Sequence, residues 1–315
     1  MIAPGSLAIL SRDPILWSAP LPARRTVVPM TPSTNNVYAR VDRCLRGQPA
    51  SDGAGVRLTR GIGGEQLPDL DPFLLLDEFG TARPEDYLAG FPDHPHRGFE
   101  TVTYMLDGRM RHKDNHGNEG VLVPGSVQWM TAGRGLVHSE MPEQLEGRMR
   151  GFQLWVNLPA RDKMSEPRYQ EFAPERISQL QPADGVTVKV IAGRVGDTIG
   201  PIAQPATDPV YLDIALAAGA AWEVALPAGH NAFAYMFEGA ASIGDGEDAR
   251  PLSAQELGVL AGGDRFKARA GDAGARLILV AGRPLREPVA RHGPFVMNTR
   301  QEVMQAFVDF EQGRF

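Results

Sequence analysis

Two short stretches of the sequence each carry a pair of side chains suited to binding a metal ion. The stretch FPDHPHRGFE contains His94 and His96, with one proline between them. The stretch TAGRGLVHSE contains His138 and Glu140 at the same spacing. Side chains at positions i and i+2 of an extended strand point to the same face of a sheet. If the two strands lie near each other with those faces inward, three imidazoles and one carboxylate converge.

This set of ligands suits a divalent transition metal. Imidazole nitrogens bind iron, copper, nickel or zinc, and a carboxylate offsets the charge of the cation. Four ligands leave positions of an octahedral ion open to a substrate or to dioxygen. Either pair alone has many explanations without a metal, such as a turn or a buried core histidine. The presence of both pairs in one β-rich half of the chain favours a metal site.

The composition is that of an ordinary globular protein. Its 315 residues fit one large domain or two of medium size. The net charge of −6 gives no broad basic surface for nucleic acid, and no apolar run approaches the ~20 residues of a membrane helix. Cys44 is the only cysteine, which excludes an intrachain disulfide and favours a reducing compartment. We therefore expect a cytoplasmic protein that binds neither nucleic acid nor membranes directly.

Glycines and prolines divide the chain into many short runs with the composition of β-strands. Such a pattern is typical of a sandwich or a barrel. The clearest helical period lies near the end of the chain, in NTRQEVMQAFVDFEQG. Asn298 or Thr299 can cap this helix and Gly313 can end it. We expect strands at residues 56–59, 73–76, 101–105, 152–156, 186–191, 211–216 and 276–280.

A short motif recurs in the two halves of the chain. Tyr104 begins the sequence YMLDG and Tyr235 begins YMFEG, at an offset of 131 residues. This repeat predicts two similar β domains. The same offset places Ala225 and Pro227 opposite the two closely spaced histidines of the first half. We therefore expect the second domain to retain the barrel and to lack the metal site.

The expected division of the chain has three parts. Residues 1–35 form a loose, Pro-rich N-terminal extension, for which a cleaved secretory signal is the alternative. Translation starts at Met1 or, as a second possibility, at Met30. Residues 36–175 form an N-terminal metal-binding domain, and residues 176–315 form a C-terminal domain without metal ligands.

The residues around the ligand pairs carry a specific resemblance. GFPDHPHRGFETVTYMLDG resembles the first motif of the pirin family, a branch of the cupin superfamily, and PGSVQWMTAGRGLVHSEMPE resembles the second. REPVARHGPFVMNT resembles the segment that closes the second pirin domain. The resemblance extends from about Val41 to Phe315. It implies an all-β fold with two tandem cupin (jelly-roll) β-barrels, to which the sequence adds a short C-terminal helix.

The resemblance also implies a cofactor and its ligands. Pirins bind one metal, usually iron, in the N-terminal barrel through three histidines and a glutamate. Carried over residue by residue, these ligands are His94, His96, His138 and Glu140. We expect one divalent transition metal, Fe2+ in the first instance, with Mn2+, Ni2+, Co2+, Cu2+ and Zn2+ as alternatives.

The chain departs from the general cupin pattern at two positions. Most cupins use a glutamate four or five residues after the paired histidines, where this chain has Glu100. Pirins use the later Glu140, so we expect Glu100 beside the ligands and leave its direct ligation open. Pro142 stands where the general second motif has an asparagine. The nearby carboxylate of Glu140 supports the narrower resemblance to pirins.

Two functions are compatible with this resemblance. Some pirin-like proteins oxygenate flavonols of the quercetin type, and this activity requires a small aromatic substrate and O2. Glu140 is then the candidate general base that takes the proton of the substrate hydroxyl. Other pirins are regulators that contact a transcription factor or a metabolic enzyme, which makes a protein partner the alternative. The native metal, the physiological substrate and the oligomeric state are left open by the sequence.

Overall fold

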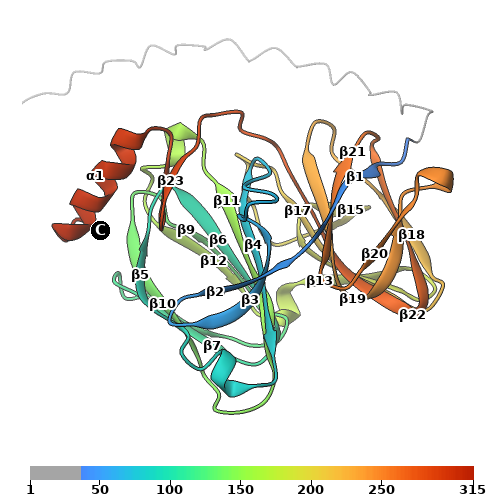
Figure 1. Ribbon diagram of the computed structural model, residues 1–315, viewed down its shortest axis with the longest axis horizontal. Helices are drawn as coiled ribbons and strands as arrows, with labels where there is room; N and C mark the ends of the chain where they lie inside the picture. Colours follow the sequence, from blue (N-terminus) through green and yellow to red (C-terminus); the bar gives the residue numbers. More distant parts are fainter. Residues whose placement is uncertain (1–36) are drawn as a thin grey trace, which may run out of the picture. The chain divides into compact units, whose positions relative to one another are not determined.

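The structure is a computed structural model that describes residues 37–315, which consist mainly of β-strands and contain one α-helix (Figure 1). The N-terminal extension predicted for residues 1–35 lies outside the described residues. The strands form two cupin-like halves, which confirms the predicted all-β fold with two barrels and a short C-terminal helix. No helix within residues 37–315 is long and apolar enough to cross a bilayer.

The first half contains two sheets whose apolar faces pack together. In spatial order, the larger sheet contains β12 (Arg168–Phe172), β9 (Val127–Thr131), β6 (Phe99–Asp107), β11 (Met149–Asn157), β4 (Phe73–Thr81), β3 (Val56–Ile62) and β2 (Gln48–Asp52). The smaller sheet contains β5 (Phe91–His96), β10 (Leu136–Pro142), β7 (Met110–Asp114) and β8 (Glu119–Leu122).

The second half is built on one nine-stranded sheet. In spatial order its main path contains β1 (Arg40–Arg46), β21 (Glu256–Ala261), β19 (Asn231–Ile243), β22 (Arg265–Gly282), β17 (Val210–Leu216), β14 (Val186–Ala192) and β13 (Ser178–Ala183). Off this path, β18 (Ala221–Ala225) pairs with β22, and β20 (Arg250–Ser253) pairs with β19. Shorter elements are β15 (Arg194–Val195), β16 (Thr198–Ile199), β23 (Ala290–His292), β24 (Phe295–Met297) and α1 (Arg300–Glu311).

The strands form where apolar and β-branched residues alternate with more polar ones. In β14 the buried Val186, Val188 and Val190 alternate with the half-buried Thr187 and Lys189, as a strand with one face in the core requires. All seven predicted strands lie within observed strands of the structure.

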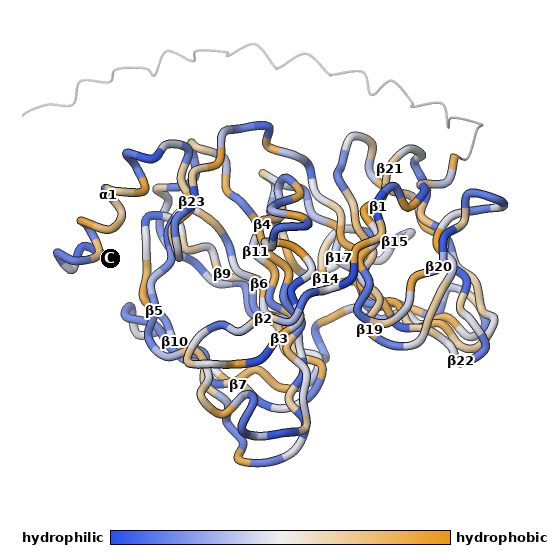
Figure 2. Tube along the Cα trace, in the orientation of Figure 1, coloured by the Kyte–Doolittle hydropathy of each residue, from blue (hydrophilic) through white to orange (hydrophobic). Residues whose placement is uncertain are grey.

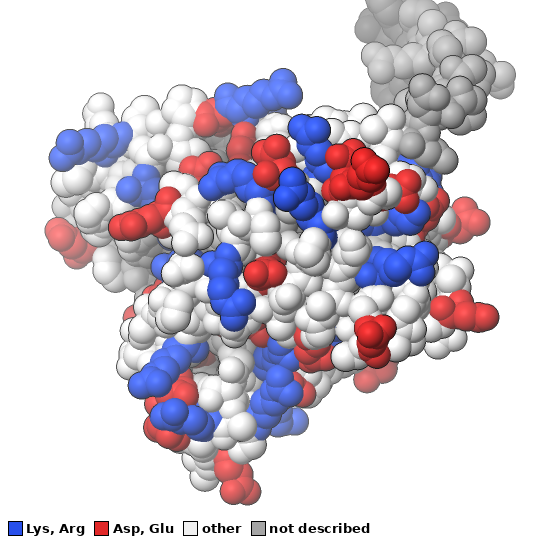
Figure 3. Space-filling model, turned by 45° about the vertical axis from the view of Figure 1, so that its right-hand side comes forward, with Lys and Arg blue, Asp and Glu red and all other residues white. Residues whose placement is uncertain are grey.

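Figure 2 shows hydrophobic residues along β14 and β17 in the middle of the molecule. Figure 3 shows basic and acidic side chains interspersed over the face that it presents.

The tyrosines of the repeated motif lie at the interface between the two halves. Tyr104 of the first half donates a hydrogen bond to Asp213 of the second at 2.5 Å. Tyr235 of the second half donates to Glu78 of the first at 2.7 Å. Each carboxylate also pairs with an arginine of its own half. Each half thus contributes a tyrosine, a carboxylate and an arginine to the interface, as two copies of one domain would.

Both ends of the described chain cross from one half to the other. Strand β1, near the start, pairs with β21 in the sheet of the second half. The closing segment, residues 290–297, follows the last long strand of the second half and returns to the first, where Val296 donates a backbone hydrogen bond to Arg97 at 3.0 Å. The predicted boundary after residue 175 falls in the turn Pro174–Arg176, between β12 and β13. The division into residues 36–175 and 176–315 stays a prediction.

Helix α1 begins with the capping interaction that the sequence predicted. Of the two candidate caps, Thr299 is the N-cap, and its side chain accepts from the backbone N–H of Glu302 at 3.2 Å. The Glu302 carboxylate in turn accepts from the backbone N–H of Thr299, which completes a capping box. Val303 and Ala306 are buried against the closing segment, so α1 is fixed to the first half through its apolar face.

Lys163 is a buried lysine whose side chain connects three segments. Its ammonium group donates hydrogen bonds to the carbonyl oxygens of Gly98 and Val296 at 2.7 and 3.0 Å, and to Asn157 Oδ1 at 2.6 Å. All three acceptors are neutral. Burial lowers the pKa of Lys163 from 10.5 to about 8.

We expect this buried charge to make stability depend on pH. Between about pH 8 and 10.5 the unfolded chain binds more protons at Lys163 than the folded protein does, so the free energy of unfolding rises with pH. Relative to Lys163→Met, the parent is expected to gain up to about 3 kcal/mol across this window. Urea unfolding of both proteins at several pH values measures the difference. A difference that does not change with pH would contradict the effect.

Candidate metal centre

The two histidine-bearing strands are neighbours, as the sequence predicted. Strand β5 carries His94 and His96, and it pairs antiparallel with β10, which carries His138. His94 lies directly opposite His138 in the register. Strand β5 is the edge of its sheet, while β10 has β7 on its other side. The central strand therefore fixes His138, whereas the paired histidines depend on an edge strand.

The three imidazoles converge at one point. One ring nitrogen from each of His94, His96 and His138 lies within 4.8 Å of the other two. The ring centroids are 4.4 to 5.1 Å apart. His96 and His138 are only 3% and 1% exposed, and His94 is half-buried beside a pocket. Among the described residues this is the one cluster of potential ligands with this geometry.

The polar atoms of these rings fit a metal ion. His94 Nδ1 lies 2.8 Å from the carbonyl oxygen of Pro92, which makes Nδ1 the protonated nitrogen and leaves Nε2 as an electron-pair donor. Both ring nitrogens of His138, and Nδ1 of His96, are buried without a hydrogen-bond partner. Buried polar atoms rarely remain unpaired. A metal ion that accepts a nitrogen lone pair would give one ring nitrogen of each histidine a partner.

Burial also selects the protonation state that metal binding requires. It lowers the pKa of His96 and His138 well below the usual value of 6.5, and the neighbouring histidines act in the same direction. Both rings are therefore neutral at neutral pH. A neutral imidazole can bind a transition metal without first losing a proton.

Glu140 lies in the same pocket but outside the three-histidine cluster. Its side chain is buried, and Oε1 accepts a hydrogen bond from Thr103 Oγ1 at 2.8 Å. The pairing of β10 with β5 is irregular between His138 and Glu140, since Glu140 pairs with Phe91 instead of continuing the register. The extra residue lies in β5, and β10 pairs regularly with β7 from His138 to Glu140, so alternation along β10 still puts Glu140 on the same face as His138. Ligation of the metal by Glu140 stays a prediction.

Thr103 of the larger sheet orients Glu140, and Gln153 of the same sheet contacts Thr103. Thr103 Oγ1 contacts both Glu140 Oε1 and, at 2.7 Å, Gln153 Oε1. A hydroxyl has a single hydrogen, so both contacts are satisfied when the Gln153 amide turns to present its NH2 group. Burial raises the pKa of Glu140 above its ordinary value, and the Thr103 hydrogen bond opposes that shift. Glu140 therefore has the character of an oriented and more basic carboxylate.

A pocket of about 550 Å³ opens beside the histidines. His94, His96 and Glu140 form part of its lining. The closing segment contributes Arg291, whose guanidinium lies 4.6 Å from the centre of the Trp155 ring. The apolar and aromatic part of the lining includes Leu58, Leu75, Phe79, Phe91, Met110 and Trp155. An apolar pocket with a few convergent polar groups is typical of a small-molecule site.

Comparison with known proteins identifies the family. The family described as Pirin matches residues 55–156, and the family described as Pirin C-terminal cupin domain matches residues 211–315. The chain belongs to the pirin family. The matched regions contain all three clustered histidines and most of the second half, so the predicted resemblance is confirmed.

Three relatives show how far the similarity of this pirin-family chain extends. The "Putative quercetin 2,3-dioxygenase" of Pseudomonas aeruginosa is 53% identical over 280 residues, which cover 88% of this chain and 98% of the relative. A "Pirin-like protein" of Caulobacter vibrioides is 56% identical over 275 residues, covering 87% and 98%. A crystal structure of quercetin 2,3-dioxygenase from Acinetobacter baumannii has a TM-score of 0.82 at 32% identity and covers 89% of this chain and 99% of that one.

Glu100, the alternative ligand, belongs to a different group of side chains. Its Oε1 accepts hydrogen bonds from Thr131 Oγ1 at 2.6 Å and from Gln204 Nε2 at 2.5 Å. Gln204 belongs to the second half of the chain, so this contact lies on the side of β6 that faces that half. Burial raises the pKa of Glu100. The structure gives it a role in joining the two halves and does not place it in the histidine cluster.

Several residues near the centre were not identified from the sequence. Arg97 stands beside a glycine in a loop, a setting typical of a solvated arginine, yet it is 3% exposed and paired with Asp309. His112 belongs to the stretch RHKDNHGNEG, whose Asp, Asn and Gly residues are typical of a hairpin turn, but it is buried on β7 opposite Glu140, and its Nε2 lies 2.7 Å from Glu171. Thr103 carried no signal at all. Strand register and the return of the closing segment, which one sequence does not reveal, place these side chains near the centre.

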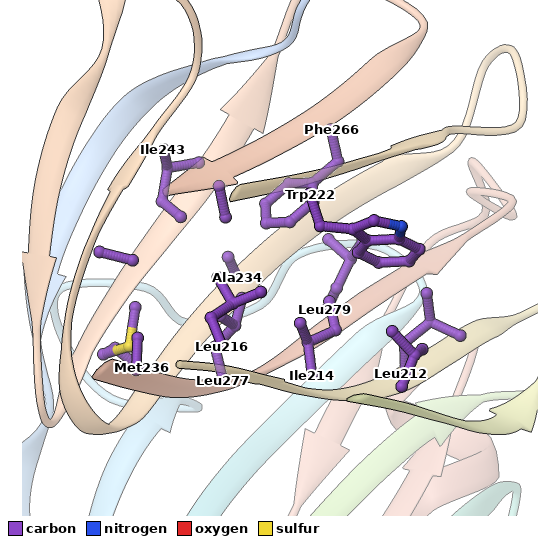
Figure 4. Close-up of a cluster of buried hydrophobic side chains, with 14 of the residues drawn as sticks. Leu212, Ile214, Leu216, Trp222, Ala234, Met236, Ile243, Phe266, Leu277 and Leu279 are labelled. Atoms are coloured by element: carbon purple, nitrogen blue, oxygen red, sulfur yellow. The ribbon is translucent and has the colours of Figure 1, made fainter. Parts of the chain in front are cut away.

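The second half has an apolar interior where the first has its histidines. Figure 4 shows Leu212, Ile214, Trp222 and their neighbours filling this interior. Ala225, the predicted counterpart of a ligand, ends strand β18. We therefore expect one metal ion per chain. Metal analysis of protein purified without oxygen measures the ratio, and two equivalents that both survive dialysis would contradict the expectation.

Proposed function

We propose that the protein is a metal-dependent dioxygenase, with Fe(II) as the first candidate metal, that acts on flavonols such as quercetin. In this reaction O2 opens the central heterocyclic ring and carbon monoxide is released. The observation that carries the proposal is the cluster of three histidines, two of them buried and neutral, beside an apolar pocket of about 550 Å³. Similarity to proteins named for quercetin 2,3-dioxygenation supports the choice of substrate.

The histidines are assigned to holding the metal. His94 presents Nε2 because its Nδ1 is engaged by the Pro92 carbonyl, and His96 and His138 present buried, unprotonated nitrogens. A metal bound here supplies a Lewis-acidic centre for the hydroxyl and carbonyl oxygens of the flavonol and access to dioxygen chemistry. A ligand set of imidazoles, with or without a carboxylate, is suited to iron, nickel, copper and zinc.

Glu140 is assigned to moving the proton. The flavonol hydroxyl must lose its proton before the ring is electron-rich enough to react with O2. Glu140 is a buried carboxylate that lines the pocket with His94 and His96, burial makes it more basic, and Thr103 holds one of its oxygens. A carboxylate with a raised pKa is better matched to accepting a proton near neutral pH. Glu140 is also assigned as the fourth metal ligand. In that role its carboxylate places a negative charge at the same site beside the histidines.

The pocket wall is assigned to holding the flat rings of the substrate. Phe91 and Trp155 offer aromatic faces, while Leu58, Leu75 and Met110 offer apolar contacts. Burying the aromatic rings of a flavonol against such a wall removes apolar surface from water. The wall also limits access of water to the reacting carbons, which favours reaction with dioxygen over hydrolysis.

A turnover screen tests the proposal. Protein stripped of metal and reloaded without oxygen with Fe2+, Mn2+, Ni2+, Co2+, Cu2+ or Zn2+ is mixed with quercetin and air. At least one metal is expected to give catalytic loss of the flavonol absorbance with matching oxygen uptake, and the stripped protein is expected to give neither. If no metal supports turnover, and capture of one protein partner from extract depends on the metal, the regulatory function replaces this one.

A further inference from the structure

Helix α1, near the end of the described chain, packs on the closing segment β23–β24 (Figure 1), and Phe315 packs on Gly135 in the loop before β10. A bridge between Arg97 and Phe295 joins the closing segment to the residue that directly follows His96. The buried apolar face of α1 packs on Phe295 and Met297. The helix is therefore linked, through Phe295, to the residue that follows the ligand candidate His96.

Arg97 connects the helix to both ligand-bearing segments. Its Nη1 donates to Asp309 Oδ2 of α1 at 2.6 Å, and its Nε donates to the carbonyl oxygen of Arg134 in the loop that leads to β10. Its guanidinium carbon lies 4.2 Å from the centre of the Phe315 ring. Since Arg97 is 3% exposed, these contacts are made out of water, where a charged hydrogen bond is strong.

Phe315 makes a second connection, to the strand of His138. Its ring covers Gly135, where an added Cβ would meet ring atoms at 2.8 Å. Asn115 Nδ2 donates to the Phe315 carbonyl oxygen at 3.0 Å, and Asn115 Oδ1 accepts from the backbone N–H of Val137 at 3.0 Å. Val137 is the neighbour of His138 along β10. Phe315 thus contacts the loop before β10 directly, and it is linked to Val137 of β10 through Asn115.

The edge strand β5 needs such support. It has a neighbour on one side only, β10, and the register of that pair is irregular. Pro92 and Pro95 within β5 have no N–H group to donate to a neighbouring strand. The sheet alone therefore fixes His94 and His96 less firmly than it fixes His138.

We propose that α1 and Phe315 form a clamp that sets the separation of the two histidine-bearing segments, with Arg97 and Asp309 as positioning residues. The clamp does not touch the metal or a substrate. It acts by holding the end of β5 and the loop before β10 at one spacing, and metal affinity falls when this spacing is free to change. The inference rests on the histidine site and is independent of flavonol chemistry.

The test compares variants that open the clamp with one that does not. Asp309→Asn removes the charge that holds Arg97, and Phe315→Ala removes the ring without altering any charge. Arg314→Gln is the matched control, because Arg314 also pairs with Asp309 but makes none of the contacts to the ligand segments. The measurements are Ni2+ affinity by competition with a chelator, and the visible absorption spectrum of the Co2+-substituted protein.

Asp309→Asn and Phe315→Ala are each expected to weaken Ni2+ binding by about 10- to 100-fold, the usual effect of groups that support metal ligands. Their Co2+ spectra are expected to change in band position or intensity, and Arg314→Gln is expected to match the parent in both measurements. Circular dichroism of the metal-free variants checks that each is folded, and if Asp309→Asn is not, Phe315→Ala decides. Parent-like affinity and spectrum in folded Phe315→Ala would overturn the clamp, as would an equal loss in Arg314→Gln.

Discussion

His138→Ala is expected to abolish stable metal binding while the protein remains folded. His138 is on the central strand of its sheet, it is 1% exposed, and both of its ring nitrogens lack other partners. Its loss should weaken metal binding by more than ~100-fold, beyond the effect of removing a supporting residue. The apolar cores of both halves do not include this side chain, so folding should not depend on the metal. Metal analysis and circular dichroism measure the two effects.

The matched control for this variant is His116→Ala, which removes an exposed histidine of the same half that lies in the turn after β7. It is expected to retain the metal content of the parent. Retention of the metal by His138→Ala would show that the ion is bound elsewhere. Unfolding of that variant would show that the site is structural, as in small zinc domains that unfold without metal.

Glu140→Gln is expected to retain part of the metal and to lose most of the turnover. Glutamine has nearly the shape of glutamate and offers an oxygen to a metal or to Thr103, but it carries no charge and cannot accept a proton at neutral pH. Removal of a general base lowers rates by ~10²–10⁴-fold. Loss of the charge should also weaken metal binding, so the rate must be expressed per bound metal. Assays of the rate of quercetin loss, together with metal analysis of the same samples, give the rate per bound metal.

Two comparisons separate the roles of Glu140. Glu143→Gln removes a carboxylate three residues away that pairs with Arg109 and Arg111 at the surface, and it is expected to behave as the parent. At a pH that already ionises the flavonol, the missing base should matter less and Glu140→Gln should recover part of its deficit. A per-metal rate equal to that of the parent at every pH would mean that Glu140 is not the base.

The histidine cluster could be predicted from the sequence because it depends on local geometry. Alternation along a strand places His94 and His96 on one face, and the pairing of β5 with β10 brings His138 opposite. The same argument holds for Glu140, because β10 pairs regularly with β7 from His138 to Glu140 and the irregular register with β5 comes from an extra residue in β5. The hydrogen bond that Glu140 accepts from Thr103 depends on the packing of two sheets, which no local pattern reveals.

The surroundings of the cluster could not be predicted because their partners are remote in the chain. Arg97 and Asp309 are 212 positions apart, and Lys163 and Val296 are 133 positions apart. Each pair forms only because the closing segment returns to the first half. The repeat indicated two similar domains, but it describes only what the two halves share. It gives no sign that β1 joins the sheet of the second half or that residues 290–297 return to the first. An arginine beside a glycine in a loop looks solvated until the helix that covers it is located.

The most direct test of the proposed function follows the oxygen atoms. The protein, loaded with its best metal, converts quercetin under an atmosphere of heavy-isotope oxygen, and mass spectrometry of the ring-opened product and gas analysis follow. The account predicts a product that carries both labelled atoms from one O2 molecule and an equal amount of carbon monoxide. A product with its new oxygen from water, or quercetin oxidised without release of carbon monoxide, would contradict a dioxygenase.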